Sequence, residues 1–362
     1  MTTFVKKAIS SLGRIPKVDR LLWHGGQFLE DLPSRYLSSE WQSERIYDNF
    51  TKTDGIRIPL IEGLRDQIKP GWRAMFRPQS AVVQQASTSA RRMDFWREKL
   101  GRVIAFLHSF SIDITGKDVL EIGSYDGVTA CALAEAGAGS VLGIDIAAYY
   151  INQAVERDIN EESAARKNSE LNVMRAAYLE IIDSSTARKV GFLEDDICAS
   201  SVPSQSRDII FSWEVMEHVT DPAAAFSEMY RMLRPGGVAF HEYNPFFSID
   251  GGHSLCTLDF IWGHVRLTDA DFDRYLKQFR RDEVDQAISF YRNNLNRMTL
   301  ADLQEHIDDA GFHSLSVIPW QKKKHLDLVT SDVLNQCRGI YPRATVSDLI
   351  SPVVWVLLQK NK

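Results

Sequence analysis

The stretch 119–145 constrains the fold more than any other part of the chain. It opens with a short apolar run, turns between Gly123 and Gly127, and continues through helix-forming residues to Gly137. A second apolar run then ends in Asp145. Apolar runs without alternation are typical of strands buried in a parallel sheet, and glycines let the backbone bend sharply beside a ligand. The stretch therefore predicts a doubly wound α/β sheet with a nucleotide at the helix N-terminus.

The spacing of these glycines decides between kinds of nucleotide. A dinucleotide fingerprint needs G-x-G-x-x-G, but Tyr125 stands at the middle position and no third glycine follows in phase. Glu121 comes just before the turn, where its charge would repel a pyrophosphate and suit a cationic ligand. Asp145, at the end of the next strand, could chelate ribose hydroxyls. This pattern argues against an NAD-dependent oxidoreductase.

The same residues resemble motif I of the class I S-adenosylmethionine (SAM)-dependent methyltransferases. That motif is E/D-x-G-x-G-x-G, and the second strand of the family ends in a ribose-binding acid. The match lies at Glu121, Gly123, Gly127 and Asp145, and Tyr125 departs from it. The resemblance implies that the chain binds SAM.

Later segments resemble the same family in the same order. The apolar run 207–212 leads into E-x-x-E-H-x-x-D-P, which spans Glu214 to Pro222 and is followed by helix-forming residues. We expect that helix at 223–233, a turn at 234–237 and a strand at 238–243. The resemblance implies a seven-stranded Rossmann-like methyltransferase sheet. A capped helix at 298–312 and antiparallel strands at 315–318 and 352–359 would close it.

The resemblance also implies where SAM binds. In this family an acid after the third strand accepts a hydrogen bond from the adenine amine. Asp196 falls at that position, Asp195 is the alternative, and Ile197 would pack on the adenine ring. The expected cofactor contacts are Glu121, Gly123, Ser124, Tyr125, Gly127, Asp145, Ile146, Asp196, Ile197, Ser212 and Trp213.

The remaining segments suggest four parts. Residues 1–90 form an N-terminal extension with a helical start and a candidate lid, and residues 91–245 form the SAM-binding core. Residues 246–296, which begin on the ligand side of the sheet, are expected to be a cap insertion over the substrate. Residues 297–362 complete the sheet, with a surface excursion expected at 321–351.

Composition narrows the partners and the compartment. The formal net charge of −6 argues against a broad nucleic-acid interface, which usually needs a basic excess. The four cysteines form no C-x-x-C pair, so we expect neither a zinc knuckle nor disulfides, in keeping with a cytoplasmic location. No apolar run reaches the roughly 18 residues of a membrane span. The basic, amphipathic segment 1–23 is expected to pack on the protein, with peripheral membrane contact as the alternative. Nothing in the sequence indicates the oligomeric state.

Histidines are the candidates for acid–base chemistry. A hydroxyl acceptor must lose its proton to a side chain or under the influence of a metal. We expect His218, His241, His253 and His264 at strand ends that face the pocket. His253 is the first choice for a general base, because the preceding Asp-Gly-Gly lets the backbone fold over the site, and His218 is the second. The alternative for each is a structural, hydrogen-bonded histidine.

A metal site is a further hypothesis. Glu214, Glu217 and His218 have helical i, i+3, i+4 spacing, so all three could face one way. The run resembles the magnesium site of small-RNA 2′-O-methyltransferases, which a downstream histidine completes, here His253. The same letters occur in metal-free relatives, so we favour a site without metal.

The sequence thus predicts SAM-dependent O-methylation of a small-molecule or glycan-like acceptor. The alternatives are a metal-assisted RNA 2′-O-methyltransferase and a non-catalytic SAM- or nucleotide-binding protein.

Overall fold

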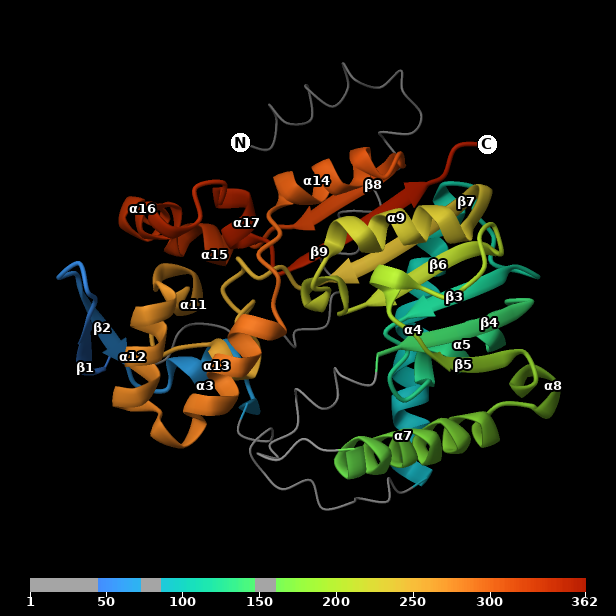
Figure 1. The fold of residues 1–362 in the computed structure, drawn as a ribbon, viewed down its shortest axis with the longest axis horizontal. Coiled ribbons are helices and arrows are strands. Elements are labelled where there is room, and N and C mark those ends of the chain that lie inside the picture. The colour runs from blue at the N-terminus through green and yellow to red at the C-terminus, as the bar shows by residue number, and fades with distance from the viewer. Residues whose placement is uncertain (1–44, 73–85, 147–160) are drawn as a thin grey trace.

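The computed structural model describes residues 45–72, 86–146 and 161–362 (Figure 1). The amphipathic segment 1–23 lies outside these residues. The described part contains a central sheet with helices on both faces, and a second group of helices gathers at one end of that sheet. None of the described helices is both long and apolar enough to cross a membrane.

The central sheet has seven strands in the order β5-β4-β3-β6-β7-β9-β8. Neighbouring strands from β5 to β7 pair in parallel, whereas β9 is antiparallel to both β7 and β8. This confirms the predicted doubly wound α/β sheet. The strand order reverses between β3 and β6, the position where open α/β sheets bind ligands. The strands are β3 (Asp118–Ile122), β4 (Ser140–Asp145), β5 (Val190–Glu194), β6 (Arg207–Trp213), β7 (Leu233–Tyr243), β8 (His313–Trp320) and β9 (Val353–Gln359).

Each face of the sheet is covered by its own apolar layer, because successive residues of a strand point to opposite sides. Phe211 packs with α4 (Ala86–Ser109), α5 (Val128–Glu135) and α7 (Glu161–Ile181). Its neighbour Ile210 packs with the helices of the other face, α9 (Pro222–Met232) and α14 (Leu300–Asp309). Both faces being buried explains why the strands read as continuous apolar runs. Short helical segments α8 (Ser184–Ala187), η3 (Ile197–Ala199) and η4 (Met216–His218) join these elements.

The turn expected at 234–237 is wrong, because β7 already begins at Leu233. Leu233 pairs with Arg207, and the next pair is Val238 with Ile209. The longer segment on β7 must therefore bulge between these pairs. Asp221 caps α9, since its side chain accepts the Ala224 N–H.

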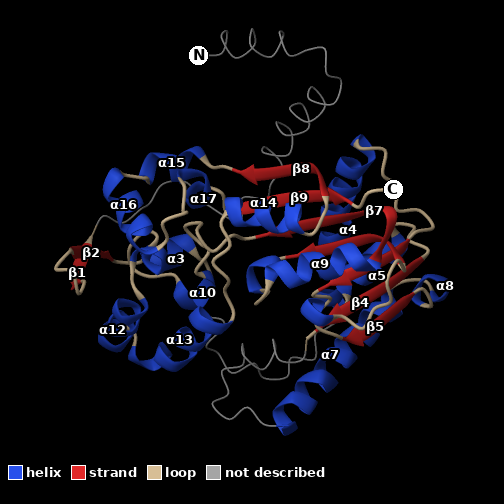
Figure 2. Ribbon diagram, turned by 45° about the horizontal axis from the view of Figure 1, so that its top comes forward, coloured by secondary structure: helices blue, strands red, loops and turns tan. Residues whose placement is uncertain are grey.

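The second group of helices, here called the cap lobe, has its own apolar core. It combines three parts of the chain, coloured blue, orange and red in Figure 1, and the turned view of Figure 2 keeps them together. Its elements are β1 (Ile46–Thr51), β2 (Arg57–Ile61), α3 (Leu64–Ile68), α10 (His253–Cys256), α11 (Gly263–Arg266), α12 (Asp269–Phe279), η5 (Arg281–Glu283), α13 (Val284–Asn293), α15 (Lys323–Leu328), α16 (Ser331–Ile340) and α17 (Val346–Ile350).

The prediction of a surface excursion at 321–351 is wrong, because this segment forms part of the cap lobe. Val333, Cys337 and Leu349 are buried in the core of the cap lobe. A predicted insertion at 246–296 is thus only one part of a lobe to which residues on both sides contribute. The division into four parts at residues 90, 245 and 296 remains a prediction.

Candidate active site

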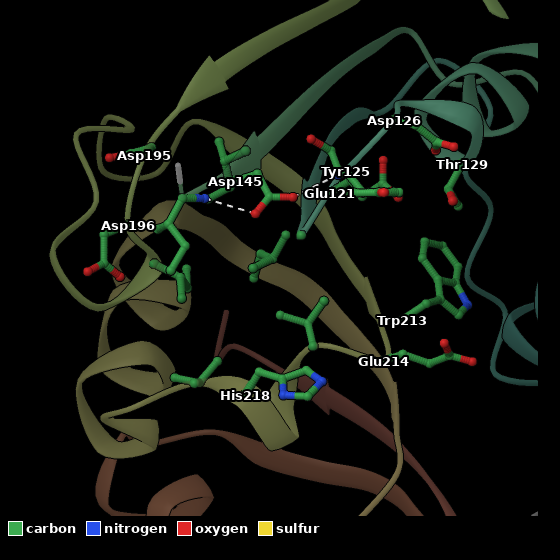
Figure 3. A pocket seen from close by; sticks show the side chains of 18 of the residues that line it. Glu121, Tyr125, Asp126, Thr129, Asp145, Asp195, Asp196, Trp213, Glu214 and His218 are labelled. Carbon is green, nitrogen blue, oxygen red and sulfur yellow. Dashed lines mark hydrogen bonds between the residues drawn. The ribbon is translucent and has the colours of Figure 1, made fainter. Parts of the chain in front are cut away.

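A cavity of about 390 Å³ lies beyond the carboxyl ends of β3, β4, β5 and β6 (Figure 3). It sits at the reversal of strand order and falls within the range of roughly 300–1,000 Å³ common for small-molecule sites. Of the expected cofactor contacts, Glu121, Gly123, Ser124, Tyr125, Asp145, Ile146, Asp196, Ile197 and Trp213 line it.

Two expected contacts do not line the cavity. Gly127 has a φ of +81° and forms the N-cap of α5, behind the turn. The Ser212 hydroxyl lies 2.8 Å from the His241 Nδ1, and both residues are buried. The Ser212 side chain is therefore engaged within the fold rather than exposed to the cavity.

Gly123 is required by close packing as well as by its backbone angle. Its φ is +74°, and a Cβ atom there would lie 2.2 Å from Cγ2 of Val215. The loop after β6 thus packs directly on the turn after β3. Tyr125, at the position of the missing glycine, also has a positive φ of 41°. Its carbonyl oxygen accepts a hydrogen bond from Arg175 Nε at 2.9 Å.

Glu121 places a buried carboxyl group in the cavity wall. It is 2% exposed, and its Oε2 atom has no hydrogen-bond partner among the described residues. Burial raises the pKa of Glu121 well above its ordinary value, and a hydrogen bond from Thr129 opposes that shift. A cationic group of a ligand would favour the charged carboxylate form of this residue.

Asp145 is held by the backbone of the two loops that meet at its strand end. Its Oδ2 atom accepts the Tyr125 N–H at 2.7 Å, and its Oδ1 atom accepts the Ile146 N–H at 2.9 Å. The carboxylate is thereby oriented on the cavity wall, where Figure 3 shows it close to Glu121 and Tyr125.

The two acids after β5 differ in how their side chains are used. Both oxygens of Asp195 accept hydrogen bonds from the following loop, at Ser200 and Ser201. Asp196 uses only Oδ1, which accepts the Cys198 N–H at 2.8 Å as the N-cap of η3. Both residues line the cavity. The geometry therefore favours Asp196 over Asp195 as an acceptor for a ligand.

Helix α4 contributes cavity residues that the sequence did not reveal. Arg92 and Trp96 line the cavity, and Arg92 Nη1 lies 3.1 Å from Oδ2 of the buried Asp126. Burial raises the pKa of Asp126, and the Arg92 guanidinium opposes this shift. Asp126 could have been suspected from its place in the turn. No motif marks Arg92, because its helix reaches the site only through the tertiary fold.

The four candidate histidines separate into two pairs. His241, on β7, forms a hydrogen bond with Ser212 on the neighbouring strand β6. His264 Nε2 lies 2.7 Å from the Phe246 carbonyl oxygen in the core of the cap lobe. Neither lines the cavity, and His253 does not line it either, so the expectation that all four face it is wrong. Both are buried between layers of the fold, which the sequence pattern could not distinguish from a strand end.

His218 and His253 do come together at the junction of the sheet and the cap lobe. His218 lines the cavity, and its ring centroid lies 4.9 Å from that of His253. The Nδ1 of His218 donates to the Asn294 carbonyl oxygen at 2.5 Å. Burial lowers the pKa of His218 to about 4 and that of His253 well below its ordinary value. Both rings are therefore neutral at pH 7.

Glu217, next to His218 in η4, completes this group. It is fully buried, burial raises its pKa to about 8, and its Oε1 lies 4.0 Å from Nε2 of His253. One ligating atom from each of Glu217, His218 and His253 lies within 4.8 Å of the other two. Glu214 does not join them: it precedes η4 with a φ of +56°, so the expected helical alignment of three residues is wrong.

Comparison with known proteins identifies the family. Residues 90–317 match the methyltransferase domain family. The chain belongs to this family. The cavity, His218 and His253 all fall within the residues matched by this methyltransferase domain.

Two relatives indicate the reach of the similarity. The chain is 33% identical over 128 residues to the ubiquinone biosynthesis O-methyltransferase of Neisseria meningitidis serogroup A, covering 35% of this chain and 44% of that protein. It is 26% identical over 217 residues to an uncharacterized methyltransferase of Mycobacterium avium, covering 60% and 67%. The chain spans about half the length of the first curated relatives it matches.

Solved structures show only a distant likeness. A phosphoethanolamine N-methyltransferase 2 of Haemonchus contortus aligns with a TM-score of 0.42 at 16% identity, covering 85% of this chain and 63% of that one. A TM-score this low supports no argument about function.

Proposed function

We propose that the protein binds SAM in the cavity and transfers its methyl group to an oxygen atom of a small-molecule or glycan-like acceptor. One observation carries the cofactor assignment: Glu121 and Asp145, at the ends of adjacent parallel strands, line the same cavity. The buried Glu121 suits the ammonium group of the cofactor, and the oriented Asp145 suits its ribose hydroxyls. Asp196 and Ile197 would hold the adenine.

The reaction would be an in-line displacement. The acceptor oxygen attacks the methyl carbon, the bond from that carbon to sulfur breaks, and its electron pair stays on sulfur. The products are the methylated acceptor and S-adenosylhomocysteine. Because the cofactor supplies the activated carbon, the protein mainly aligns the two reactants and assists loss of the acceptor proton.

We place proton removal at His253 and His218, with His253 as the first choice. Burial keeps both rings neutral, so each has one ring nitrogen without a proton, and the lowered pKa makes each ring a weaker base than an exposed imidazole. Phe290 lies against both, with ring centroids 5.8 Å from His253 and 6.0 Å from His218. An apolar ring beside a neutral imidazole suits an acceptor that presents a hydroxyl on an apolar or ring-shaped body.

The comparisons support oxygen as the acceptor atom, since O-methyltransferases are among the relatives. The net charge of −6 weighs against an RNA acceptor. The four cysteines are free, which fits a cytoplasmic location. The Glu121 oxygen without a partner among the described residues, in a fully formed cavity, weighs against the alternative of a non-catalytic protein with a degenerate site.

The test is incubation with methyl-labelled SAM and a panel of phenols, sugars and short RNAs. We expect label on a phenol or sugar and none on RNA, with the label lost in Asp145→Ala. Transfer to an amine or to RNA would contradict the proposed acceptor class.

A further inference from the structure

The junction of the sheet and the cap lobe holds a mixed group of nitrogen and oxygen ligands, here called the Glu–His group: Glu217, His218 and His253. Glu217 and His218 belong to η4, after β6, and His253 begins α10, so the group joins two lobes. One ligating atom from each lies within 4.8 Å of the other two. No other set of three such residues this close occurs in the described part of the chain.

Two polar atoms of this group have no hydrogen-bond partner among the described residues. These are Oε2 of Glu217, which is fully buried, and Nε2 of His253. A buried polar atom without a partner costs roughly 1–3 kcal/mol, so folds seldom retain two side by side. The nearest approach between the two residues, 4.0 Å from His253 Nε2 to Glu217 Oε1, is too long for a hydrogen bond. A species between them would satisfy both.

We propose that the Glu–His group binds a divalent first-row transition-metal ion. Imidazole nitrogens suit zinc, iron, nickel and copper rather than magnesium, and two histidines with one carboxylate form a three-ligand set that leaves positions open. Since His218 also lines the cavity, the open positions would face the acceptor's side of the site.

Neighbouring residues already hold these ligands in place. His218 donates its Nδ1–H to the Asn294 carbonyl oxygen, which leaves the lone pair of the neutral ring on Nε2. Histidines that bind metals commonly make this second hydrogen bond. Glu217 Oε1 accepts the Asn244 N–H at 3.3 Å, which leaves the other oxygen for an ion.

The short helix that carries His253 is fixed from the cap lobe. Arg65 Nη2 donates to the Ser254 carbonyl oxygen at 2.5 Å, and Arg280 donates to the carbonyl oxygens of Leu255 and Thr257. His253 itself has a φ of +51°, unusual for a residue other than glycine. These contacts hold the imidazole at the junction despite its strained backbone.

Glu217 would bind the ion as a carboxylate. Any proton on its buried carboxyl group would be released to solvent as the ion binds, because the ligands of a metal must be deprotonated.

The ion's role in catalysis rests on the proposed function, whereas its binding does not. A bound ion would lower the pKa of an acceptor hydroxyl that it coordinates, and the released proton would pass to solvent. His218 and His253 would then assist proton loss through the ion rather than by accepting the proton themselves.

Binding of Co²⁺ tests the inference without any assay of methyl transfer. The full chain is treated with EDTA, dialysed and titrated with Co²⁺, and visible absorption reports the coordination. We expect one Co²⁺ per chain, with X-ray absorption of the wild-type complex showing two imidazole ligands. The wild-type measurement remains decisive even where a variant fails to fold.

Matched variants locate the ion. We expect Glu217→Gln and His253→Gln to bind Co²⁺ at least about 100-fold more weakly, the upper end of the loss seen when only a supporting residue is removed. His313→Gln makes the same change at an exposed residue of β8 and should bind Co²⁺ as the wild type does. Circular dichroism confirms that each variant is folded.

Each other outcome overturns one claim. SAM binding without Co²⁺ uptake would refute the metal site and leave the proposed function standing with an imidazole base. Equal uptake by all variants would place the ion elsewhere and refute the inference. Co²⁺ uptake without SAM binding would leave the metal site standing and refute the proposed function.

Discussion

The cofactor end and the acceptor end of the site are built in different ways. At the cofactor end, Asp145 is held by N–H groups of Tyr125 and Ile146, and these residues and Glu121 all lie within the stretch 121–146. At the acceptor end, His218 is held by the distant Asn294 and lies against His253. The first region is built from the sheet and the helices and loops packed on it, whereas the second exists only once the cap lobe packs on the sheet.

This difference implies that the two ends can be damaged separately. Changes at the acceptor end should spare SAM binding, and changes at the cofactor end should act on SAM binding first. The following predictions test that separation, in order of decreasing effect.

The largest effect is expected for His253→Gln. Loss of an acid–base group typically lowers turnover by about 10²- to 10⁴-fold. Since His253 does not line the cavity, SAM affinity measured by calorimetry should change less than about twofold, on the order of the error in additive effects between separate sites. Joint loss of turnover and SAM affinity would show that the residue is structural and that the two ends are not separable.

Asp145→Ala should weaken SAM binding by about 100-fold. Two hydrogen bonds to a charged carboxylate, at about 1.5–3 kcal/mol each, exceed the roughly 2.7 kcal/mol that such a factor requires. Asp145→Asn is the matched control. It keeps one oxygen acceptor, so its SAM affinity should lie between those of the wild type and Asp145→Ala. Unchanged affinity in Asp145→Ala would place the ribose at another strand end.

Asn296→Ala should destabilise the junction by about 1–3 kcal/mol, the cost of leaving buried carbonyl groups unsatisfied. The Asn296 amide donates at 2.6 Å to the carbonyl oxygen of Met216, the first residue of η4, and at 3.0 Å to that of Val219, its C-cap. Urea unfolding measures the loss. A stability equal to that of the wild type would mean that η4 is held without this side chain.

Glu121→Gln should stabilise the ligand-free protein at neutral pH while it weakens SAM binding. The folded-state pKa of Glu121 lies well above its ordinary value of 4.5. As pH rises past that ordinary value, the unfolded chain releases its proton first, so the contribution of Glu121 to stability is full below it and is lost toward the folded-state pKa.

Glutamine has no proton to lose at that position. The stability gain of Glu121→Gln over the wild type should therefore be larger at pH 7 than at pH 4 in thermal unfolding. A gain independent of pH would contradict the role assigned to the buried carboxyl group.

The smallest effect is expected for Ser212→Ala. Its hydroxyl is engaged by His241 away from the cavity, so SAM affinity should change less than about twofold. A larger loss of affinity would restore Ser212 to the cofactor contacts expected from the sequence.

The sequence predicted the cofactor end well because its signals are local. Gly123, Gly127 and the strand ends near them follow from apolar runs, turn residues and a helix start that lie next to each other in the chain. The strands expected at 207–212, 315–318 and 352–359 and the helices expected at 223–233 and 298–312 were predicted for the same reason, whereas the start of β7 was not.

The acceptor end depends on contacts between distant segments, which no local pattern contains. His241 and His264 share the sequence context of His253, and only the fold shows them bonded to Ser212 and to a backbone carbonyl. Arg92 reaches the cavity from α4 without any motif. Residues 321–351 were expected to be a surface excursion because the apolar partners of their short helices lie in distant segments of the cap lobe.

Calorimetric titration with SAM and with S-adenosylhomocysteine, each with and without EDTA, tests the central claim most directly. The account predicts micromolar binding of both compounds that EDTA does not change, because none of the proposed cofactor contacts belongs to the Glu–His group. A folded protein that binds neither compound would contradict the assignment of the cavity to SAM.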